Sequence, residues 1–131
     1  MSLLEECLAA LGSHAEIIKN PEKNTIVKKL TTNFPPTKYG RIDWNTIEKK
    51  RSLQSVDDIL PTLTTLGKKS PESLYVIWYD SSLPAVKTTL EAVAQNIDDV
   101  TAVSFDTWLY CPADGWVVEF YHDGEIIIGF A

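Results

Sequence analysis

The sequence has few of the residues from which catalytic and metal sites are usually built. Two cysteines and two histidines occur among 131 residues, and none of the four belongs to a C-x-x-C, H-x-x-x-H or H-E-x-x-H motif. The patterns G-x-x-x-x-G-K-[ST], G-x-G-x-x-G and G-x-S-x-G are also absent. We therefore expect no metal site, no cofactor and no catalytic centre.

Long apolar runs and a basic leader are missing as well. The apolar runs fall far short of the roughly 20 residues that cross a bilayer. The N-terminus carries Glu5 and Glu6 among its apolar residues, with no basic stretch before them, which is unlike a signal peptide. With 44% hydrophobic and 23% charged residues, the composition is that of an ordinary globular protein. These features predict a cytoplasmic protein with one domain over residues 1–131.

The two cysteines, Cys7 and Cys111, lie far apart in the sequence. One disulfide is possible, but two reduced thiols in a cytosolic protein are the simpler interpretation. Cys7 falls on the apolar stripe of a predicted helix, and Cys111 follows a predicted strand near a proline turn. We expect both thiols to serve packing rather than reactivity.

Positive charge is almost absent from the second part of the chain. Residues 1–79 hold nine acids and eleven bases, whereas residues 80–131 hold nine acids and one base, so the two parts carry +2 and −8 and together give −6. This balance argues against binding to nucleic acid or to an anionic membrane, and it allows a basic macromolecular partner. The short basic clusters 28–29, 49–51 and 68–69 have no interleaved aromatic residues, so we interpret them as solvated surface.

Three short helices are predicted in the first half. Residues 2–11 begin with a capping box at Ser2 and end before a glycine. Residues 20–34 begin with Asn-Pro and end before a double proline, with Lys23 on the outer face. Residues 58–66 begin with an aspartate N-cap and also end before a glycine.

A strand and a helix are predicted in the middle of the chain. Residues 74–79 are six apolar or aromatic residues in a row, which is typical of a strand covered on both faces. Residues 84–97 carry apolar residues at helical spacing after a proline. A strand, a helix and another strand form a crossover that is normally parallel and right-handed.

Earlier in the chain, apolar and polar residues alternate over residues 39–44, which predicts a strand or extended segment pinned by Trp44.

The C-terminal part predicts three strands in quick succession. Residues 103–110 alternate, a Pro-Ala-Asp-Gly turn follows, and residues 116–121 run back to an Asp-Gly turn. A two-residue type I′ turn at this second site places Phe120 opposite Ile127. The expected fold class is therefore α+β: N-terminal helices packed on a mixed β-sheet that ends in a three-stranded antiparallel meander, with one βαβ crossover.

One alternative involves chemistry at Asp80. This residue ends the 74–79 strand and precedes two serines and a helix start, which is the usual ligand position of an α/β sheet but also an ordinary N-cap cluster. A small hydrolase or metal-dependent nuclease could use Asp80, Asp106 or His122. A nuclease commonly has a lysine beside its carboxylates, and Lys87 is the one base after Lys69.

Acidic and aromatic residues occur together in the meander. Aromatic side chains give contact area at low entropic cost, and carboxylates attract a cationic partner and pair with its Lys and Arg. The alternative is that the tryptophans belong to the core and that the acids form a solvated rim. The candidate partner-binding residues are Asp106, Trp108, Tyr110, Asp114, Glu119, Tyr121, Asp123 and Glu125.

Three stretches of the sequence resemble a known family. Tyr-Gly-Arg-Ile-Asp-Trp at 39–44, Trp-Leu-Tyr at 108–110 and Gly-Trp-Val-Val-Glu-Phe-Tyr-His-Asp-Gly-Glu-Ile at 115–126 resemble small immunity proteins of bacterial contact-dependent growth inhibition and related polymorphic toxin systems. The resemblance implies a cytoplasmic, non-enzymatic protein that forms a 1:1 complex with the C-terminal toxin domain of its effector, often a nuclease. It would block the toxin's active site or substrate surface. A gene directly downstream of a large secreted toxin gene would favour this function over the hydrolase.

Overall fold

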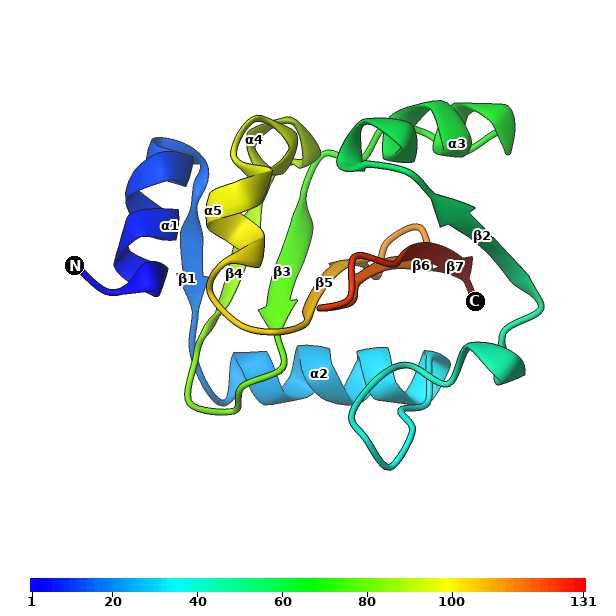
Figure 1. Ribbon diagram of the computed structural model, residues 1–131, viewed down its shortest axis with the longest axis horizontal. Coiled ribbons are helices and arrows are strands. Elements are labelled where there is room, and N and C mark those ends of the chain that lie inside the picture. Colours follow the sequence, from blue (N-terminus) through cyan, green and yellow to red (C-terminus); the bar gives the residue numbers. More distant parts are fainter.

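A seven-stranded antiparallel sheet organises the chain (Figure 1). The computed structural model describes residues 1–131 and contains five α-helices, so the predicted α+β class is confirmed. The helices are α1 Leu3–Leu11, α2 Glu22–Asn33, α3 Ile59–Thr65, α4 Leu90–Gln95 and α5 Ile97–Thr101. The strands are β1 Glu16–Ile18, β2 Lys49–Leu53, β3 Leu74–Trp78, β4 Ala85–Thr88, β5 Thr107–Cys111, β6 Trp116–Phe120 and β7 Ile126–Phe130.

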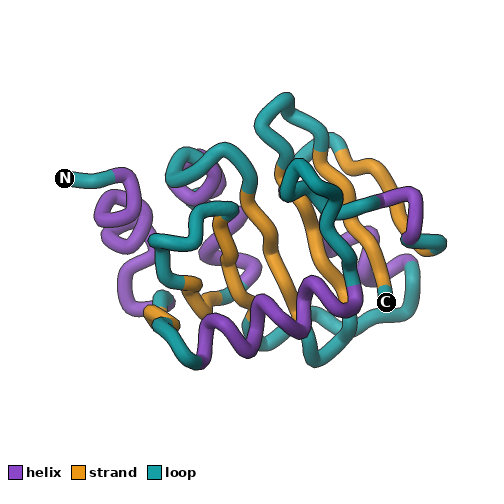
Figure 2. The backbone as a smooth tube through the Cα atoms, turned by 90° about the horizontal axis from the view of Figure 1, so that it is seen from below, coloured by secondary structure: helices purple, strands orange, loops and turns teal.

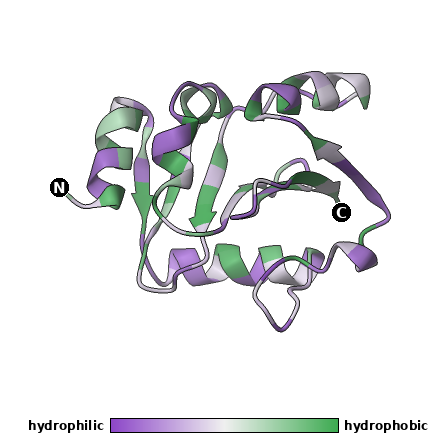
Figure 3. Ribbon diagram, viewed as in Figure 1, coloured by the Kyte–Doolittle hydropathy of each residue, from purple (hydrophilic) through white to green (hydrophobic).

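Helices cover both faces of this sheet, whose strand order is β1-β4-β3-β5-β6-β7-β2. Helix α2 runs across one face together with the segment 35–47, and α1, α3, α4 and α5 cover the other (Figures 1 and 2). Every residue of β5 and of β6 is buried. Their continuous burial explains why these central strands carry mostly apolar and aromatic residues. The neighbouring strand β3 is also largely buried, and it is mostly hydrophobic in Figure 3. None of the helices is long and apolar enough to span a membrane.

The first two helices form largely as predicted. The Ser2 hydroxyl accepts a hydrogen bond from the Glu5 amide at 3.1 Å, and the Glu5 carboxylate accepts one from the Ser2 amide at 3.2 Å, which confirms the capping box. Helix α2 buries Leu30 against the sheet. The prediction for Lys23 is wrong: its side chain is 7% exposed, and its ammonium donates to the carbonyl of Leu83.

The predicted helix over 84–97 and the parallel crossover are wrong. Residues 85–88 form β4, which pairs antiparallel with β3, and two short helices follow it. Strand β5 also runs antiparallel to β3, so the sheet is not mixed. Ala85, Val86 and Thr88 are all buried because elements cover both faces of β4. Burial on both faces removes the alternation that would have indicated a strand.

The predicted meander of β5, β6 and β7 is confirmed, but its register differs by one residue. Phe120 lies opposite Ile126, and Glu119 lies opposite Ile127. The Tyr121 amide donates to the Glu125 carbonyl at 2.9 Å, which leaves a three-residue loop. A type I′ turn needs positive φ at both central residues. Gly124 has φ 100°, whereas Asp123 has no positive φ, so the turn cannot be of that type.

The sequence predictions missed strand β2 and misplaced the start of β5. Strand β2 is an edge strand that pairs with β7, and its basic residues are exposed, as expected for the cluster 49–51. Charged residues on an edge strand discourage pairing with other chains. The segment 39–44 is neither a strand nor extended throughout: it begins in a turn in which the Gly40 amide donates to the Thr37 carbonyl, and it ends at a 3₁₀ helix over Trp44–Thr46. A single bridge joins Pro36 and Ile42, and Trp44 is buried in the core.

Candidate partner-binding surface

The buried carboxylate of Glu119 joins the meander to the segment 39–44. The side chain is 1% exposed. It accepts hydrogen bonds from Arg41 Nε at 2.8 Å, the Ile42 amide at 2.9 Å, Trp44 Nε1 at 2.9 Å and Trp108 Nε1 at 3.0 Å. A buried charge is tolerated when it is paired and its lone pairs are satisfied. All three sequence stretches that resemble the immunity proteins therefore meet at one carboxylate.

Arg41 extends this network to the surface. Its guanidinium pairs with Glu125 as well as with Glu119, and it lies over the Tyr121 ring with its Cζ 4.1 Å from the ring centroid. Burial alone would lower the pKa of the guanidinium, but the hydrogen bonds from Arg41 to Glu125 and Glu119 outweigh that effect and raise it. The turn before Arg41 is thereby fixed beside the loop between β6 and β7.

A second buried carboxylate fixes the loop between β6 and β7. Asp106 is 6% exposed, and its Oδ1 accepts a hydrogen bond from the His122 amide at 3.0 Å. The same oxygen lies 3.1 Å from Nδ1 of the half-exposed His122 ring. Phe105, directly before Asp106, is 83% exposed, and its ring packs edge-on against His122.

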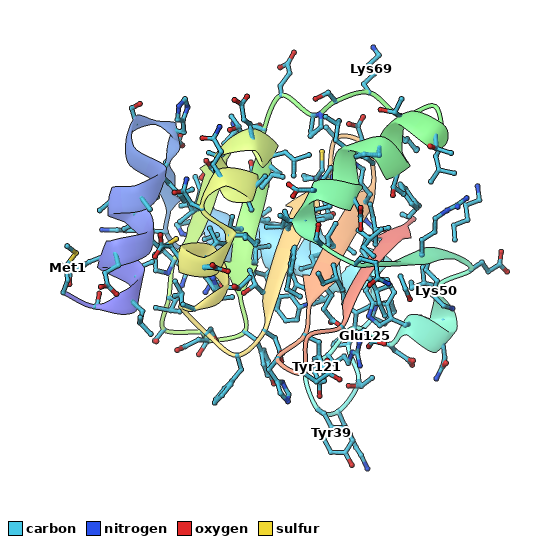
Figure 4. The ribbon with its side chains drawn as sticks, turned by 45° about the horizontal axis from the view of Figure 1, so that its top comes forward. Met1, Tyr39, Lys50, Lys69, Tyr121 and Glu125 are labelled. Carbon is cyan, nitrogen blue, oxygen red and sulfur yellow. The ribbon has the colours of Figure 1, made fainter.

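Aromatic side chains gather where these networks reach solvent. Because neighbouring strands are antiparallel, the ends of β3 and β6 and the starts of β5 and β7 lie at the same edge of the sheet. Figure 4 shows Tyr39, Tyr121 and Glu125 together at this end, away from Met1 and Lys69. We call this surface the aromatic rim; it consists of Tyr39, Tyr79, Phe105, Tyr121 and His122.

A cleft of about 360 Å³ lies between α2 and the sheet beside the aromatic rim. Tyr79 and Asp80 line it, and Lys23 reaches it from α2. Burial lowers the pKa of the Lys23 ammonium, although Asp80 opposes this effect. The exposed Asp80 carboxylate accepts hydrogen bonds from the Ser82 hydroxyl at 2.6 Å and the Ser82 amide at 2.9 Å. These two bonds lower the pKa of Asp80 and shape the turn between β3 and β4.

Of the three residues that the hydrolase alternative would use, only two are in contact with each other. Asp106 contacts His122 directly, whereas Asp80 is bonded within its own turn. No three side chains of histidine, cysteine, aspartate or glutamate lie close enough together to hold a metal ion. Both cysteines are free and buried. Burial, with Asp99 nearby, raises the pKa of the Cys7 thiol to about 11.

The structure divides the eight candidate partner-binding residues into three groups. Four are buried, and a partner that leaves the fold intact does not reach them; they are Asp106, Trp108, Tyr110 and Glu119. Asp114 lies in the turn between β5 and β6, at the opposite end of the meander. Of the remaining three, Tyr121 and Glu125 lie at the aromatic rim (Figure 4). Asp123 lies between them in the loop that joins β6 to β7, where its carboxylate accepts a hydrogen bond from the Glu125 amide at 2.8 Å.

Sequence reasoning did not select three exposed residues of the rim. Tyr39 is 75% exposed, Tyr79 52% and Phe105 83%. Tyr79 and Phe105 were predicted inside strands, but β3 ends before the first and β5 begins after the second. An aromatic residue directly before an acid at a strand boundary was the available signal, since both residues have this neighbour.

A group of exposed aromatic rings at one end of the sheet is typical of a surface that binds another protein. The family of CdiI immunity proteins of the EcoliA0-like type matches residues 1–129. The chain therefore belongs to this family of immunity proteins of contact-dependent growth inhibition, whose partner is a cognate toxin. No curated protein matches the chain.

Proposed function

We propose that this immunity protein neutralises a nuclease toxin domain by binding it in a 1:1 complex and covering its active site or substrate surface. Residues 1–131 would act in the cytoplasm as one domain and by binding alone, without turnover of a substrate. The observation that carries the proposal is the family match over residues 1–129.

Charge supports a nuclease as the partner. A nuclease binds an anionic substrate, so the surface around its active site is commonly basic. The immunity protein carries −8 in residues 80–131, and Asp123 and Glu125 lie exposed at the end of the meander. Such a surface competes for the same basic residues that hold the nucleic acid.

The proposed contact residues at this end are Tyr121, Asp123 and Glu125. Asp106 and Glu119 would contribute indirectly, because they fix the loop and the guanidinium that lie beneath these contacts. Trp108 and Tyr110 pack in the core on the α2 side of the sheet. Asp114 lies outside the proposed surface.

Coexpression tests this function. The proposal predicts that the gene directly upstream encodes a large secreted protein, and the C-terminal domain of that protein is the toxin domain to test. We expect that domain to arrest growth alone, the immunity protein to restore growth, and native mass spectrometry to show a 1:1 complex. Persistent arrest in the presence of folded immunity protein would contradict the proposal. In extracts, the toxin domain should degrade nucleic acid until an equimolar amount of immunity protein is added; a toxin without nuclease activity would refute that part alone.

A further inference from the structure

Three neighbouring strands begin or end at the same end of the sheet, and at each of these positions an aromatic residue is followed by an acid one or two residues later. Strand β3 lies next to β5, and β5 lies next to β6. Since β5 runs antiparallel to both, its start lies beside their ends. The pairs are Tyr79 with Asp80, Phe105 with Asp106, and Tyr121 with Asp123.

Hydrogen bonds hold these strand ends in place. The Tyr79 amide donates to the Asp106 carbonyl at 3.1 Å, and the His122 amide donates to the Asp106 carboxylate at 3.0 Å. The three segments are thus joined through one residue. The backbone from which the rings project is therefore held in one arrangement, which lowers the entropic cost of binding a partner.

A tight turn adds Tyr39 to this surface. The Gly40 amide donates to the Thr37 carbonyl at 3.0 Å, and the Thr37 amide donates to the Arg41 carbonyl at 2.6 Å. Gly40 lies against the Tyr79 ring so closely that a Cβ at this position would overlap the ring. Tyr39 projects from the turn and is 75% exposed (Figure 4).

Rings of the rim already bind cations within the protein. The Arg41 guanidinium lies over the Tyr121 ring, 4.1 Å from its centroid, and the Lys38 ammonium lies 5.1 Å from the centroid of the Tyr39 ring. Cations are attracted to aromatic faces at such distances. Tyr79 and Phe105 are also exposed, and no cation of the protein lies over either of their rings.

We propose that the aromatic rim, together with the exposed carboxylates of Asp80, Asp123 and Glu125, binds arginine and lysine side chains of the toxin domain. Ring faces and carboxylates would hold the same cationic groups, with Tyr39 and Phe105 as the principal anchors. This inference rests on the proposed function and names the surface and the chemistry of its partner. Exposed apolar side chains elsewhere provide controls, because Leu3 and Leu60 are exposed but belong to no aromatic cluster.

Alanine substitutions locate the surface. We expect Tyr39→Ala and Phe105→Ala each to weaken binding of the purified toxin domain on the order of tenfold to a hundredfold. Leu3→Ala and Leu60→Ala should change it less than threefold. Circular dichroism checks that each variant is folded. If the wild-type protein binds and both aromatic variants bind equally well, the aromatic rim is not the binding surface, and the proposed function stands. If the wild-type protein does not bind the toxin domain, both the proposed surface and the proposed function are wrong.

Conservative substitutions test the chemistry. Phe105→Tyr and Tyr39→Phe retain an aromatic face and should retain binding, whereas Phe105→Leu and Tyr39→Leu should lose it to about the same extent as alanine. Binding by the leucine variants at wild-type strength would show that apolar area alone is needed, and it would overturn recognition of cations by the rings.

Discussion

At the scale of single residues, the buried carboxylate of Glu119 connects distant parts of the chain. Its carboxylate accepts four hydrogen bonds, three of them from the segment 41–44, which lies 75 to 78 residues away in sequence. Each donor is itself buried or half-buried and would lose its partner if the carboxylate were removed. A buried charge with this many partners stabilises one arrangement of the chain rather than a general hydrophobic packing.

We expect Glu119→Ala to lower the free energy of unfolding by about 3–5 kcal/mol, because it leaves the buried donors and the Arg41 charge without their partner. Urea denaturation measures this loss. Glu91→Ala, at an exposed acid of α4, is the matched control and should change stability by less than about 0.5 kcal/mol. Equal stability of the two variants would show that the network contributes little.

Cys7 predicts a dependence of stability on pH. An unfolded thiol titrates near its ordinary pKa of 9.0, whereas the folded thiol has a pKa of about 11. Between these values the folded state keeps a proton that the unfolded state has lost, so the free energy of unfolding should fall as pH rises from 9 to 11. Cys7→Ala should show a smaller fall than the wild type. Parallel curves for the two proteins would contradict this explanation.

At the scale of secondary structure, the sequence predicted elements that are defined by local signals. The capping box of α1 and the apolar run of β3 depend on residues close together in the chain, and both are confirmed. Strand β4 was missed because its burial on both faces comes from distant elements that pack against it. The edge strand β2 was missed because pairing with β7, rather than an apolar pattern, makes it a strand.

The meander shows the same limit for the register of two paired strands. The turn residues Asp123 and Gly124 predicted a hairpin correctly, but they did not distinguish a two-residue loop from a three-residue loop. In the structure, Gly124 alone adopts positive φ. The one-residue difference decides that Glu119, rather than Phe120, lies opposite Ile127.

We expect cross-strand NMR contacts between Phe120 and Ile126 and between Glu119 and Ile127. Gly124→Ala should destabilise the protein by about 1 kcal/mol or more, because alanine disfavours positive φ. Gly124→Asn should cost less, since asparagine tolerates such backbone conformations better than alanine. Contacts between Phe120 and Ile127 would instead support the type I′ turn.

The candidate site was predicted in outline only. The concentration of acids and rings in the meander was visible in the sequence, and three of the eight selected residues lie at the aromatic rim. The sequence could not show that Trp108 and Tyr110 face α2 or that Glu119 is internal. Those facts depend on helix α2 and on the 39–44 segment covering that face of the sheet.

At the scale of the whole molecule, the uneven charge distribution predicts how fast the toxin domain associates and how salt changes that rate. Long-range attraction raises the association rate of oppositely charged surfaces, and salt weakens it because the screening length falls to about 8 Å at physiological ionic strength. We expect the double variant Asp80→Lys with Asp123→Lys to lower the association rate and its dependence on salt, as measured by surface plasmon resonance.

The matched control is Glu91→Lys with Asp98→Lys. Each double variant changes the net charge of −6 by the same four units, but the control acids lie on α4 and α5. The control should therefore retain more of the wild-type rate. Equal effects of the two double variants would mean that net charge alone matters and that its position does not.

Amide hydrogen exchange with and without the toxin domain tests the central claim most directly, because it reports every segment in one experiment. The proposed complex predicts new protection in residues 37–41, 79–82, 105–106 and 121–125, with none in α1 or β2. Protection confined to α1, α3 or β2, with no change at the end of the sheet where the aromatic rim lies, would contradict it.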